Sequence, residues 1–298
     1  MSTTQPLVSV ISVNYNEPEE TELFLESLYQ SDYHNFETLL VDNGSKRNID
    51  PSVENRYSNL SLIVSEKNLG FAGGNNLGVA KAKGKYLIFL NNDTLLPRDF
   101  IDKLVMFMET HPEAGMVSPK IVFPNGKIQY AGSLDINGIT GRGKRIGYLE
   151  EDHGQYDKNY PTDLPHGAAM IVPAKVISEV GSMYEEYFLY YEEHDWSMAI
   201  KRAGYKIYFF GETNIIHKQS ISVGIDSPLK VYYMSRNRLL FQKRNFSPFN
   251  TVLSVLFYSF FALPKSSIKY LSSGKTAQFK NLWRGYLWHL NKNYVFKG

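Results

Sequence analysis

The sequence predicts an α/β fold, with a mixed, mostly parallel sheet flanked by helices and a helical extension at the C-terminus. Three observations support this fold class. Short β-branched runs alternate with helix-like segments through the first half, polar turn residues follow those runs, and the last quarter of the chain changes in composition. The chain has 298 residues, 43% of them hydrophobic. That length allows one large domain or two small ones, and the composition excludes collagen-like, disordered and disulfide-stapled proteins.

The elements of the first half can be placed along the chain. A helix is expected over residues 19–30, because Phe24 and Leu28 lie four residues apart and glutamates fill the first turns. A glycine- and asparagine-rich loop and then a short helix over Asn75–Ala82 are expected before the fourth strand. The expected strands are Val8–Val13, Phe36–Val41, Leu60–Val64 and Tyr86–Leu90. This alternation implies right-handed crossovers and a ligand crevice at the carboxyl ends of the strands.

The second half of the chain has a different residue pattern. After Met116 the chain is broken by prolines and glycines, which predicts hairpins and long loops that shape a substrate site. An apolar strand pattern returns at Ala168–Val172. A helix over Glu192–Ala203, ended by Gly204, and a strand over Tyr205–Phe209 are expected to follow.

Two polar clusters directly follow predicted strands. Asp42 and Asn43 follow one strand, and Asn91, Asn92 and Asp93 follow another. Because the carboxyl ends of neighbouring parallel strands meet at one edge of a sheet, both clusters are expected at the same rim. Either cluster alone is also typical of an ordinary turn, since turns favour these residue types for backbone reasons. Their joint placement favours a ligand site.

An acidic cluster lies at the expected start of a later helix. Glu192, Glu193 and Asp195 stand beside four aromatic residues. Carboxylates at a helix start can simply cap it and interact with its dipole. Alternatively, one of them is a general base whose pKa is tuned by burial and by a neighbouring carboxylate. A lone histidine such as His217 is usually structural, but together with Asp93 it would form a mixed nitrogen and oxygen site suited to Mn²⁺ or Mg²⁺.

The formal net charge of +2 conceals two parts of opposite sign. Residues 1–225 carry 20 Lys and Arg against 29 Asp and Glu, a balance of −9. Residues 226–298 carry 12 Lys and Arg against the single Asp226, a balance of +11, and 16 of these 73 residues are aromatic. This basic, aromatic tail predicts attachment to an anionic membrane surface. The alternatives are a helical subdomain that packs on the rest of the chain and a homo-oligomer interface.

Several other classes are disfavoured. No recognisable nucleic-acid module is present, so no nucleic-acid partner is expected. The most apolar stretch, Thr251–Leu263, has 13 residues and is bounded by Pro264, which is short of the roughly 20 that a membrane-crossing helix needs. The N-terminus lacks the pattern of a secretory signal and the chain has no cysteine, which predicts a cytoplasmic protein. A glycine-rich segment raises the alternative of a Rossmann dehydrogenase, but it follows the third strand and lacks the G-x-G-x-x-G spacing.

Eight segments occur in an order that is typical of one family. They are VSVISVNYN (Val8–Asn16), VDNGS (Val41–Ser45), NLGFAGGNNLG (Asn68–Gly78), LNND (Leu90–Asp93), EEHDW (Glu192–Trp196), RAGY (Arg202–Tyr205), IIH (Ile215–His217) and YYMSRNRLLF (Tyr232–Phe241). In this succession the chain resembles the family-2 glycosyltransferases with the GT-A fold. Within that family it is similar to the rhamnosyltransferase-like branch that builds bacterial surface polysaccharides, including O-antigen and cell-wall glycans.

The resemblance implies roles for the polar residues of the first half. It implies that Asn14 and Asn16 line the nucleotide pocket and that Asp42 hydrogen-bonds a pyrimidine base. It also implies that Asn68 and the glycine-rich loop that includes Gly70 lie against the ribose and phosphates.

The resemblance also implies a metal site. The triplet Asn91, Asn92 and Asp93 matches the family's DXD motif, in which the last Asp holds the divalent metal bound to the diphosphate. Asn91 departs from this pattern, because the family has an acid there. Asp93 and His217 are therefore the main candidate ligands of Mn²⁺ or Mg²⁺.

Catalytic roles follow in the same way. Glu193 matches the usual catalytic base, where the family more often has Asp, and the longer side chain leaves Glu192 and Asp195 as alternatives. The stretch that begins with His166 and Gly167 matches a segment that lines the sugar region, although tight strand packing would also explain the small residues after it. A single base without a carboxylate nucleophile implies one displacement, with inversion at the anomeric carbon.

Together these observations predict a catalytic domain over residues 1–225, with a nucleotide-sugar half to about residue 118 and an acceptor half over about 119–225. A basic, mostly helical extension is expected over 226–298. The expected reaction moves a sugar, L-rhamnose from dTDP-rhamnose in the first place, to a hydroxyl of a saccharide or lipid-linked saccharide at the inner face of the cytoplasmic membrane. A UDP-hexose donor and an inactive sugar-nucleotide-binding protein are the alternatives.

Overall fold

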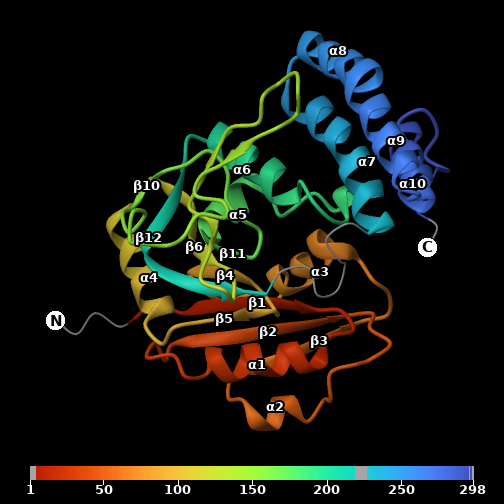
Figure 1. Ribbon diagram of the computed structural model, residues 1–298. Helices are drawn as coiled ribbons and strands as arrows, with labels where there is room; N and C mark the ends of the chain where they lie inside the picture. The colour runs from red at the N-terminus through yellow and green to blue at the C-terminus, as the bar shows by residue number, and fades with distance from the viewer. Residues whose placement is uncertain (1–4, 219–226, 295, 297–298) are drawn as a thin grey trace.

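The computed structural model describes residues 5–218, 227–294 and 296, and a ten-stranded sheet forms its centre (Figure 1). Four strands of the first half run parallel to one another. They are β1 (Val8–Asn14), β2 (Phe36–Asn43), β3 (Leu60–Ser65) and β4 (Tyr86–Asn91). β1 pairs with both β2 and β4, and β3 lies beyond β2. The four strands predicted for this half are confirmed, each within two residues of its expected bounds.

The other half of the sheet is mixed in direction. Its strands are β5 (Thr94–Leu95), β6 (Ala114–Val122), β7 (Ile128–Tyr130), β10 (Tyr160–Pro161), β11 (Ala169–Pro173) and β12 (Lys206–His217). β11 runs antiparallel to both β4 and β6, and β12 runs parallel to β6. The path across the sheet is β10-β12-β6-β11-β4-β1-β2-β3, and β8 (Ser133–Leu134) pairs with β9 (Lys144–Arg145) in a separate ribbon. The predicted mixed, mostly parallel α/β class is confirmed.

Helices cover both faces of this sheet. The set on one face is α1 (Pro18–Leu28), α2 (Val53–Arg56) and α4 (Phe100–Thr110), whose apolar residues share one core with β1 and β2. The set on the other face is α3 (Gly70–Val79), α5 (Ala174–Val180) and α6 (Glu192–Arg202), with the 3-10 turn η1 (Glu185–Tyr187) before α6. Alternation along the strands explains the two cores, since Val10 faces the first and Ile11 the second.

The structure corrects the prediction for the glycine-rich segment. The expected loop is helical from Gly70, so α3 replaces the helix that was expected over Asn75–Ala82. The reason is tertiary packing. A Cβ on Gly74 would come within 2.9 Å of the Val13 side chain, so glycine lets the first half of α3 lie directly on the sheet. That contact offsets the helix propensity lost with each glycine, about 1 kcal/mol per residue.

The strand expected over Tyr205–Phe209 is also longer than predicted. β12 runs on to His217, with a register shift in its pairing with β6 between Phe210 and Asn214. Irregularities of this kind re-aim the side chains that follow them. His217 is the last residue of the strand.

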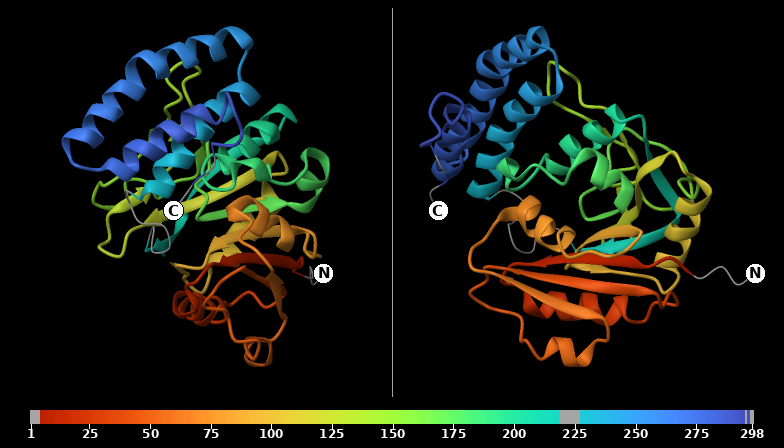
Figure 2. Two further views of the ribbon diagram at one scale, coloured as in Figure 1. Left: turned by 90° about the vertical axis from the view of Figure 1, so that its right-hand side faces the viewer. Right: turned by 180° about the vertical axis from the view of Figure 1, so that it is seen from behind.

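The C-terminal extension is helical, as predicted. Its elements are α7 (Pro228–Asn245), α8 (Pro248–Phe257), the π-helical turn η2 (Tyr258–Ala262), α9 (Leu263–Ser272) and α10 (Thr276–Leu287). α8 and α9 continue one another as a long rod beside α7 and α10 (Figure 2). Phe241 of α7 shares a core with Tyr187 and Tyr191, so the extension packs on the rest of the chain. The predicted boundary at residues 225 and 226 lies outside the described residues.

The apolar stretch of the extension does not end where the sequence suggested. The helix is continuous over Pro248–Ser272, which is 25 residues, and so passes through Pro264. The π turn directly before Pro264 accommodates the missing N–H of that residue. Judged by length and composition alone, Pro248–Ser272 is the one helix among the described residues that is long and apolar enough to cross a membrane.

Candidate active site

The ends of the parallel strands meet at one rim of the sheet, as predicted. Asn14 of β1 lies opposite Asp42 of β2, and Val13 lies opposite Asn91 of β4. Asn14 is fully buried, and its Oδ1 accepts a hydrogen bond from the Thr21 hydroxyl at 3.1 Å. This amide therefore ties the end of β1 to α1.

The turn after β2 is organised by Ser45, which the sequence analysis did not single out. Its hydroxyl oxygen accepts hydrogen bonds from Nδ2 of Asn14 at 3.2 Å and from the main-chain N–H of Asn16 at 2.9 Å. Asp42 is buried, and its two oxygens accept from the N–H groups of Ser45 (3.2 Å) and Ile49 (2.8 Å). The predicted nucleotide-binding residues Asn14, Asn16 and Asp42 thus form one preformed wall, and their contacts with a nucleotide stay a prediction.

A second asparagine network fixes the entry to α3. Asn43 donates through Nδ2 to Oδ1 of Asn68 (3.2 Å) and to the main-chain oxygen of Gly70 (2.9 Å), and accepts from the N–H of Leu69 (3.0 Å). Gly70 has a φ of 72°, and a Cβ there would come within 2.1 Å of the Phe188 carbonyl oxygen. Glycine is therefore required at this position, because the loop before the acidic motif touches its backbone.

Asp93 and His217 lie side by side at this rim. Oδ1 of Asp93 lies 3.2 Å from Nε2 of His217; the His217 side chain is buried and the Asp93 side chain is 11% exposed. The same nitrogen lies 3.2 Å from Nδ2 of Asn91. On the far side of the ring, Oε1 of Gln129 lies 2.8 Å from Nδ1. That carbonyl oxygen holds a hydrogen on Nδ1 and leaves the lone pair on Nε2, facing Asp93.

This donor set fits a hard divalent cation. Oδ1 of Asp93 is buried and has no hydrogen-bond partner among residues 5–218, 227–294 and 296, so a cation would satisfy it. A carboxylate oxygen and an imidazole nitrogen suit Mn²⁺ or Mg²⁺, which are often held by one or two side chains together with phosphate oxygens and water. No cluster of three or more His, Cys, Asp or Glu able to hold a metal occurs within the described residues. Asn92 points elsewhere, donating to the Thr21 hydroxyl at 2.8 Å.

The segment His166–Gly167 lies between these residues and the acidic motif. The His166 ring is 5.8 Å from the His217 ring, measured between centroids. Burial, together with the neighbouring His217, lowers the pKa of His166 well below its ordinary value. A Cβ on Gly167 would lie 3.5 Å from Oε1 of Glu193. The predicted sugar-lining segment and the predicted base are therefore adjacent.

Glu192 and Glu193 differ sharply in environment. Glu192 is 3% exposed, and burial together with the Glu193 carboxylate raises the pKa of Glu192 well above its ordinary value. The Glu193 side chain is 16% exposed, and its Oε1 lies 3.4 Å from Nδ1 of His194. Its Oε2 has no hydrogen-bond partner within the described part of the chain. Because two adjacent carboxylates do not readily both ionise in a buried site, the Glu193 carboxylate adds to the rise in the pKa of Glu192.

Asp195 has a full set of partners instead. Its oxygens accept from Nε (3.1 Å) and Nη2 (3.2 Å) of Arg244, from Nδ2 of Asn245 (2.6 Å) and from the Tyr187 hydroxyl (3.0 Å). Arg244 and Asn245 belong to the last turn of α7. Asp195 therefore joins α6 to α7.

The loop before the acidic motif has an unusual backbone. Tyr190 and Tyr191 have φ values of 71° and 76°, a region that aromatic residues adopt only when their surroundings force it. Nδ2 of Asn237 on α7 donates to the main-chain oxygens of Tyr187 (2.9 Å), Leu189 (2.7 Å) and Tyr190 (2.8 Å). This contact was not predicted, because no local pattern connects residues that lie 47 to 50 positions apart.

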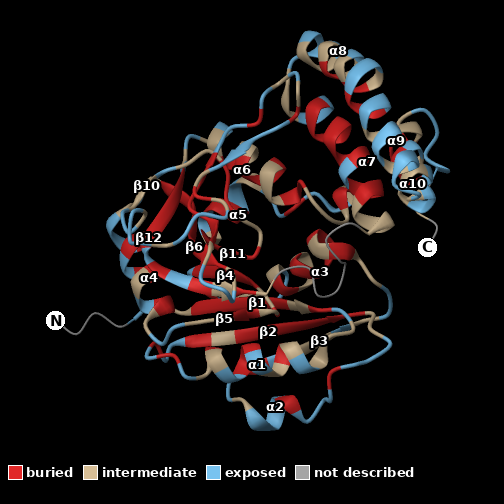
Figure 3. Ribbon diagram, viewed as in Figure 1, coloured by how far each residue is buried: buried red, intermediate tan, exposed pale blue. Residues whose placement is uncertain are grey.

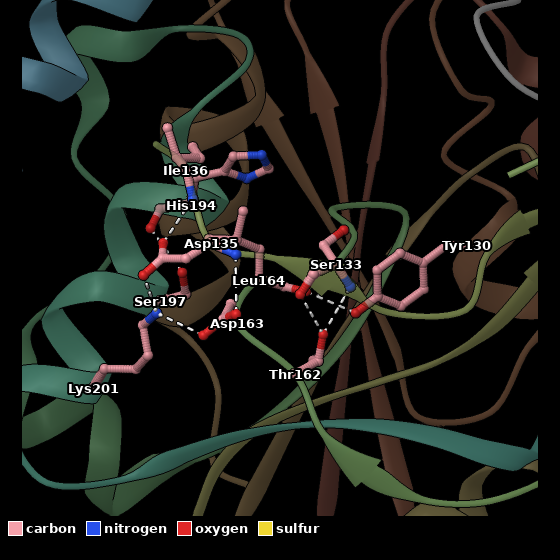
Figure 4. Close-up of polar contacts among 10 residues, drawn as sticks. All are labelled: Tyr130, Ser133, Asp135, Ile136, Thr162, Asp163, Leu164, His194, Ser197 and Lys201. Atoms are coloured by element: carbon pink, nitrogen blue, oxygen red, sulfur yellow. Dashed lines mark hydrogen bonds and ion pairs between the residues drawn. The ribbon is translucent and has the colours of Figure 1, made fainter. Parts of the chain in front are cut away.

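Two loops of the second half, which carry Asp135 and Asp163, are tied to α6 (Figure 4). Nζ of Lys201 lies 3.4 Å from Oδ2 of Asp135 and 3.7 Å from Oδ1 of Asp163. Oδ2 of Asp163 accepts from the N–H of Asp135 at 3.0 Å, and the Tyr130 hydroxyl donates to the Leu164 main-chain oxygen at 2.8 Å. The loops of the second half therefore form a fixed wall beside the helix that carries the acids.

Comparison with known proteins identifies the class to which this fold and site belong. The family model of glycosyl transferase family 2 matches residues 9–177, more than half of the chain. The chain therefore belongs to glycosyl transferase family 2, as the motifs indicated. The fold is that of the GT-A glycosyltransferases, and the family-model match covers β2 to β11 and nearly all of β1, the Asp93 motif and the His166–Gly167 segment, but not β12.

Three similar proteins illustrate the range of the family. The chain is 27% identical over 245 residues to the low-salt glycan biosynthesis hexosyltransferase Agl10 of Haloferax volcanii, covering 80% of this chain and 76% of that protein. It is 23% identical over 244 residues to the N-acetylglucosaminyl-diphospho-decaprenol L-rhamnosyltransferase of Mycobacterium tuberculosis, covering 74% and 78%. The mannosyltransferase PcManGT from Pyrobaculum calidifontis, solved with GDP-Man and Mn²⁺, superposes with a TM-score of 0.60 at 15% identity, covering 97% and 88%. Two other relatives are much longer, and the chain spans 19% and 26% of their lengths.

Proposed function

We propose that this glycosyltransferase works by single displacement with inversion and that Glu193 is the base. The observation that carries the assignment is Oε2 of Glu193, which has no hydrogen-bond partner among the described residues, on a carboxylate that faces Gly167. Asp195 is paired with Arg244, and burial and the Glu193 carboxylate raise the pKa of Glu192, which opposes its ionisation. Glu193 is therefore the acid best able to accept a proton.

In the proposed reaction, Glu193 accepts the proton of the acceptor hydroxyl as the acceptor oxygen bonds to the anomeric carbon. The bond from that carbon to the diphosphate breaks on the opposite side, which inverts the configuration. Asp93 and His217 would hold Mn²⁺ or Mg²⁺, which neutralises the charge of the leaving diphosphate. The Gln129 contact keeps the His217 ring in the orientation that such a ligand needs.

We propose dTDP-L-rhamnose as the donor and a lipid-linked saccharide as the acceptor. The support is the Mycobacterium tuberculosis relative, whose name gives an L-rhamnosyl transfer and a diphospho-decaprenol acceptor. A UDP-hexose is the second candidate donor, favoured by the hexosyltransferase relative from Haloferax volcanii. With such an acceptor in surface-polysaccharide synthesis, the enzyme would work as a peripheral protein at the inner face of the cytoplasmic membrane.

The test is transfer from a panel of nucleoside-diphosphate sugars with Mn²⁺ present, using wild type, Glu193→Gln and the matched exposed control Glu179→Gln. We expect Glu193→Gln to lower kcat by about 10²-fold or more, because loss of a general base typically has that effect, while nucleotide affinity is unchanged. Glu179→Gln should behave as wild type. Retention of more than about a tenth of wild-type kcat by Glu193→Gln would show that another group is the base.

The inactive alternative is tested in the same panel. The replacement of an acid by Asn91 motivates it. An active transferase slowly hydrolyses its donor when no acceptor is present. Nucleotide binding without hydrolysis or transfer for any donor would favour a sugar-nucleotide-binding protein.

A further inference from the structure

One face of the helix formed by α8, η2 and α9 is apolar and open to solvent. Its most exposed apolar residues are Phe249, Val252, Phe260, Phe261, Ile268 and Leu271, with exposed fractions from 54% to 71%. Apart from Phe261, they follow one another at steps of three and eight residues, which places them along one side of a helix. We call this the α8–α9 face. Figure 3 shows the contrast between the buried α7 and the exposed α8 and α9. A continuous exposed apolar surface marks an interaction site.

The opposite side of the same helix is fixed to the protein. The Tyr258 hydroxyl lies 2.7 Å from Oγ of Ser235 on α7, and Oγ of Ser259 lies 2.6 Å from the Tyr286 hydroxyl on α10. Nε1 of Trp283 donates to Oγ of Ser267 at 3.0 Å. These contacts prevent the helix from turning its apolar side inward, so the α8–α9 face stays directed outward.

The charges around this face are all of one sign. Lys265 and Lys269 are exposed on α9, and Lys280 is exposed on α10. Residues 227–298 contain no Asp or Glu at all. An apolar helix side bordered by basic residues is complementary to the interface of an anionic bilayer, where acyl chains take the apolar side chains and headgroups take the lysines.

This charge distribution distinguishes a membrane from a second copy of the chain. Symmetric association through the α8–α9 face would bring two strongly basic tails together, and their repulsion opposes the contact. A membrane-crossing arrangement is disfavoured as well. It would place in hydrocarbon the polar side that is hydrogen-bonded to Ser235 and Tyr286, together with exposed lysines.

We infer that the α8–α9 face lies in the interface plane of an anionic membrane and holds the enzyme there as a peripheral protein. This deepens the proposed function, on whose peripheral membrane location it rests, by naming the surface that makes the contact; it depends on neither the donor sugar nor the base. The face is joined to the acceptor side. Nη2 of Arg238 on α7 donates to the main-chain oxygen of Thr140, and the Cβ position of Gly138 lies 2.9 Å from the Phe246 ring beside α8 (Figure 1). A membrane-bound acceptor would therefore be presented on the side where the acceptor loops lie.

Vesicle flotation tests the inference. Purified protein is mixed with vesicles of phosphatidylglycerol and phosphatidylcholine, or of phosphatidylcholine alone, at low and high salt. Wild type should float with the anionic vesicles at low salt, and less at high salt, because the lysine contribution is screened. Phe260→Ser with Phe261→Ser should reduce the bound fraction by about tenfold or more, since two exposed aromatic side chains no longer enter the interface. Lys265→Glu with Lys269→Glu should reduce it by a similar factor.

Matched variants on the catalytic part separate this effect from general changes in the surface. Val64→Ser with Met106→Ser removes exposed apolar residues, and Lys81→Glu with Lys83→Glu reverses exposed charges. Both should float as wild type does, and all variants should keep the wild-type Tm. The inference is overturned if wild type does not float with anionic vesicles at low salt, or if the Phe260 and Phe261 double variant floats unchanged. It is equally overturned if light scattering shows that wild type is a dimer and the double variant a monomer, while wild type does not bind vesicles.

Discussion

Asn237 of α7 holds the main-chain oxygen of Tyr190 at 2.8 Å, two residues before the first acid of the EEHD motif. Tyr190 has a φ of 71°, and its backbone is kept in this region from outside its own loop. Composition alone marks the basic tail as a separate unit, yet its helix α7 fixes the backbone directly before α6. The tail therefore controls the position of Glu192 and Glu193, the first two residues of α6. Arg236 adds to this control by donating to the Tyr187 main-chain oxygen at 2.6 Å.

Replacing Asn237 with Ala should therefore damage both stability and turnover. We expect the free energy of unfolding to fall by about 2–3 kcal/mol, because buried carbonyl oxygens lose their donor. We expect kcat to fall about tenfold or more with little change in the KM for the donor, since misplacement of the acids affects the reacting geometry more than nucleotide binding. Urea unfolding and donor-saturation kinetics measure the two effects. Asn293→Ala, an exposed change in the same tail, is the control, and equal kcat values for the two variants would contradict this role.

Asp195 should act through structure, in contrast to Glu193. Asp195→Asn weakens the contact with Arg244, whose side chain is 37% exposed, so we expect a loss of about 2 kcal/mol in stability, less than for a fully buried pair. At a temperature where the variant is folded, kcat should stay within about fivefold of wild type, because its carboxylate takes no proton in the proposed reaction. Chemical denaturation and kcat at 15 °C, about 288 K, provide the measurement. A stable variant with a 10²-fold loss in kcat would instead make Asp195 the base.

The imidazole of His217 should determine how much Mn²⁺ the enzyme needs for activity. His217→Asn removes the nitrogen that faces Asp93, and we expect the Mn²⁺ concentration for half-maximal activity to rise about 10- to 100-fold. Nucleotide binding without metal should change little. Activity against Mn²⁺ concentration and calorimetric nucleotide titration check these expectations, with exposed His153→Asn as the control. An unchanged metal requirement would leave His217 a structural residue.

The raised pKa of Glu192 predicts how stability depends on pH. The native state holds a proton on Glu192 that the unfolded chain releases near the ordinary value of 4.5. Between 4.5 and the higher native pKa, the native state binds more protons than the unfolded state, so this group's contribution to stability falls as the pH rises. Glu192→Gln should remove that fall and gain stability over wild type from about pH 5 to pH 8. Urea unfolding across this range measures it, Glu179→Gln serves as the control, and parallel curves for wild type and Glu192→Gln would refute the expectation.

Local pattern was sufficient for much of the fold. The β-branched runs predicted β1 to β4 within two residues, and the rule that parallel strands end at one rim predicted that the clusters at Asp42 and Asn91 lie at the same edge. Pattern was insufficient for the start of α3, because the segment from Gly70 to Gly74 is helical where a close contact with the sheet is available, such as that of Gly74 with Val13. That contact joins residues far apart in the chain, and no propensity contains it.

By itself, the sequence determined the strands, the polar rim, the candidate residues for metal binding and proton transfer, and the opposite charges of the two parts. Only the tertiary structure decided how those residues are used. Gln129 reaches His217 across 88 positions, and Arg244 reaches Asp195 across 49. Glu192 is more deeply buried than Glu193. Packing on α7 and α10 directs one side of α8 and α9 outward. The physical reason is the same in each case: pKa, hydrogen bonding and exposure depend on neighbours in space, whereas the sequence specifies neighbours along the chain.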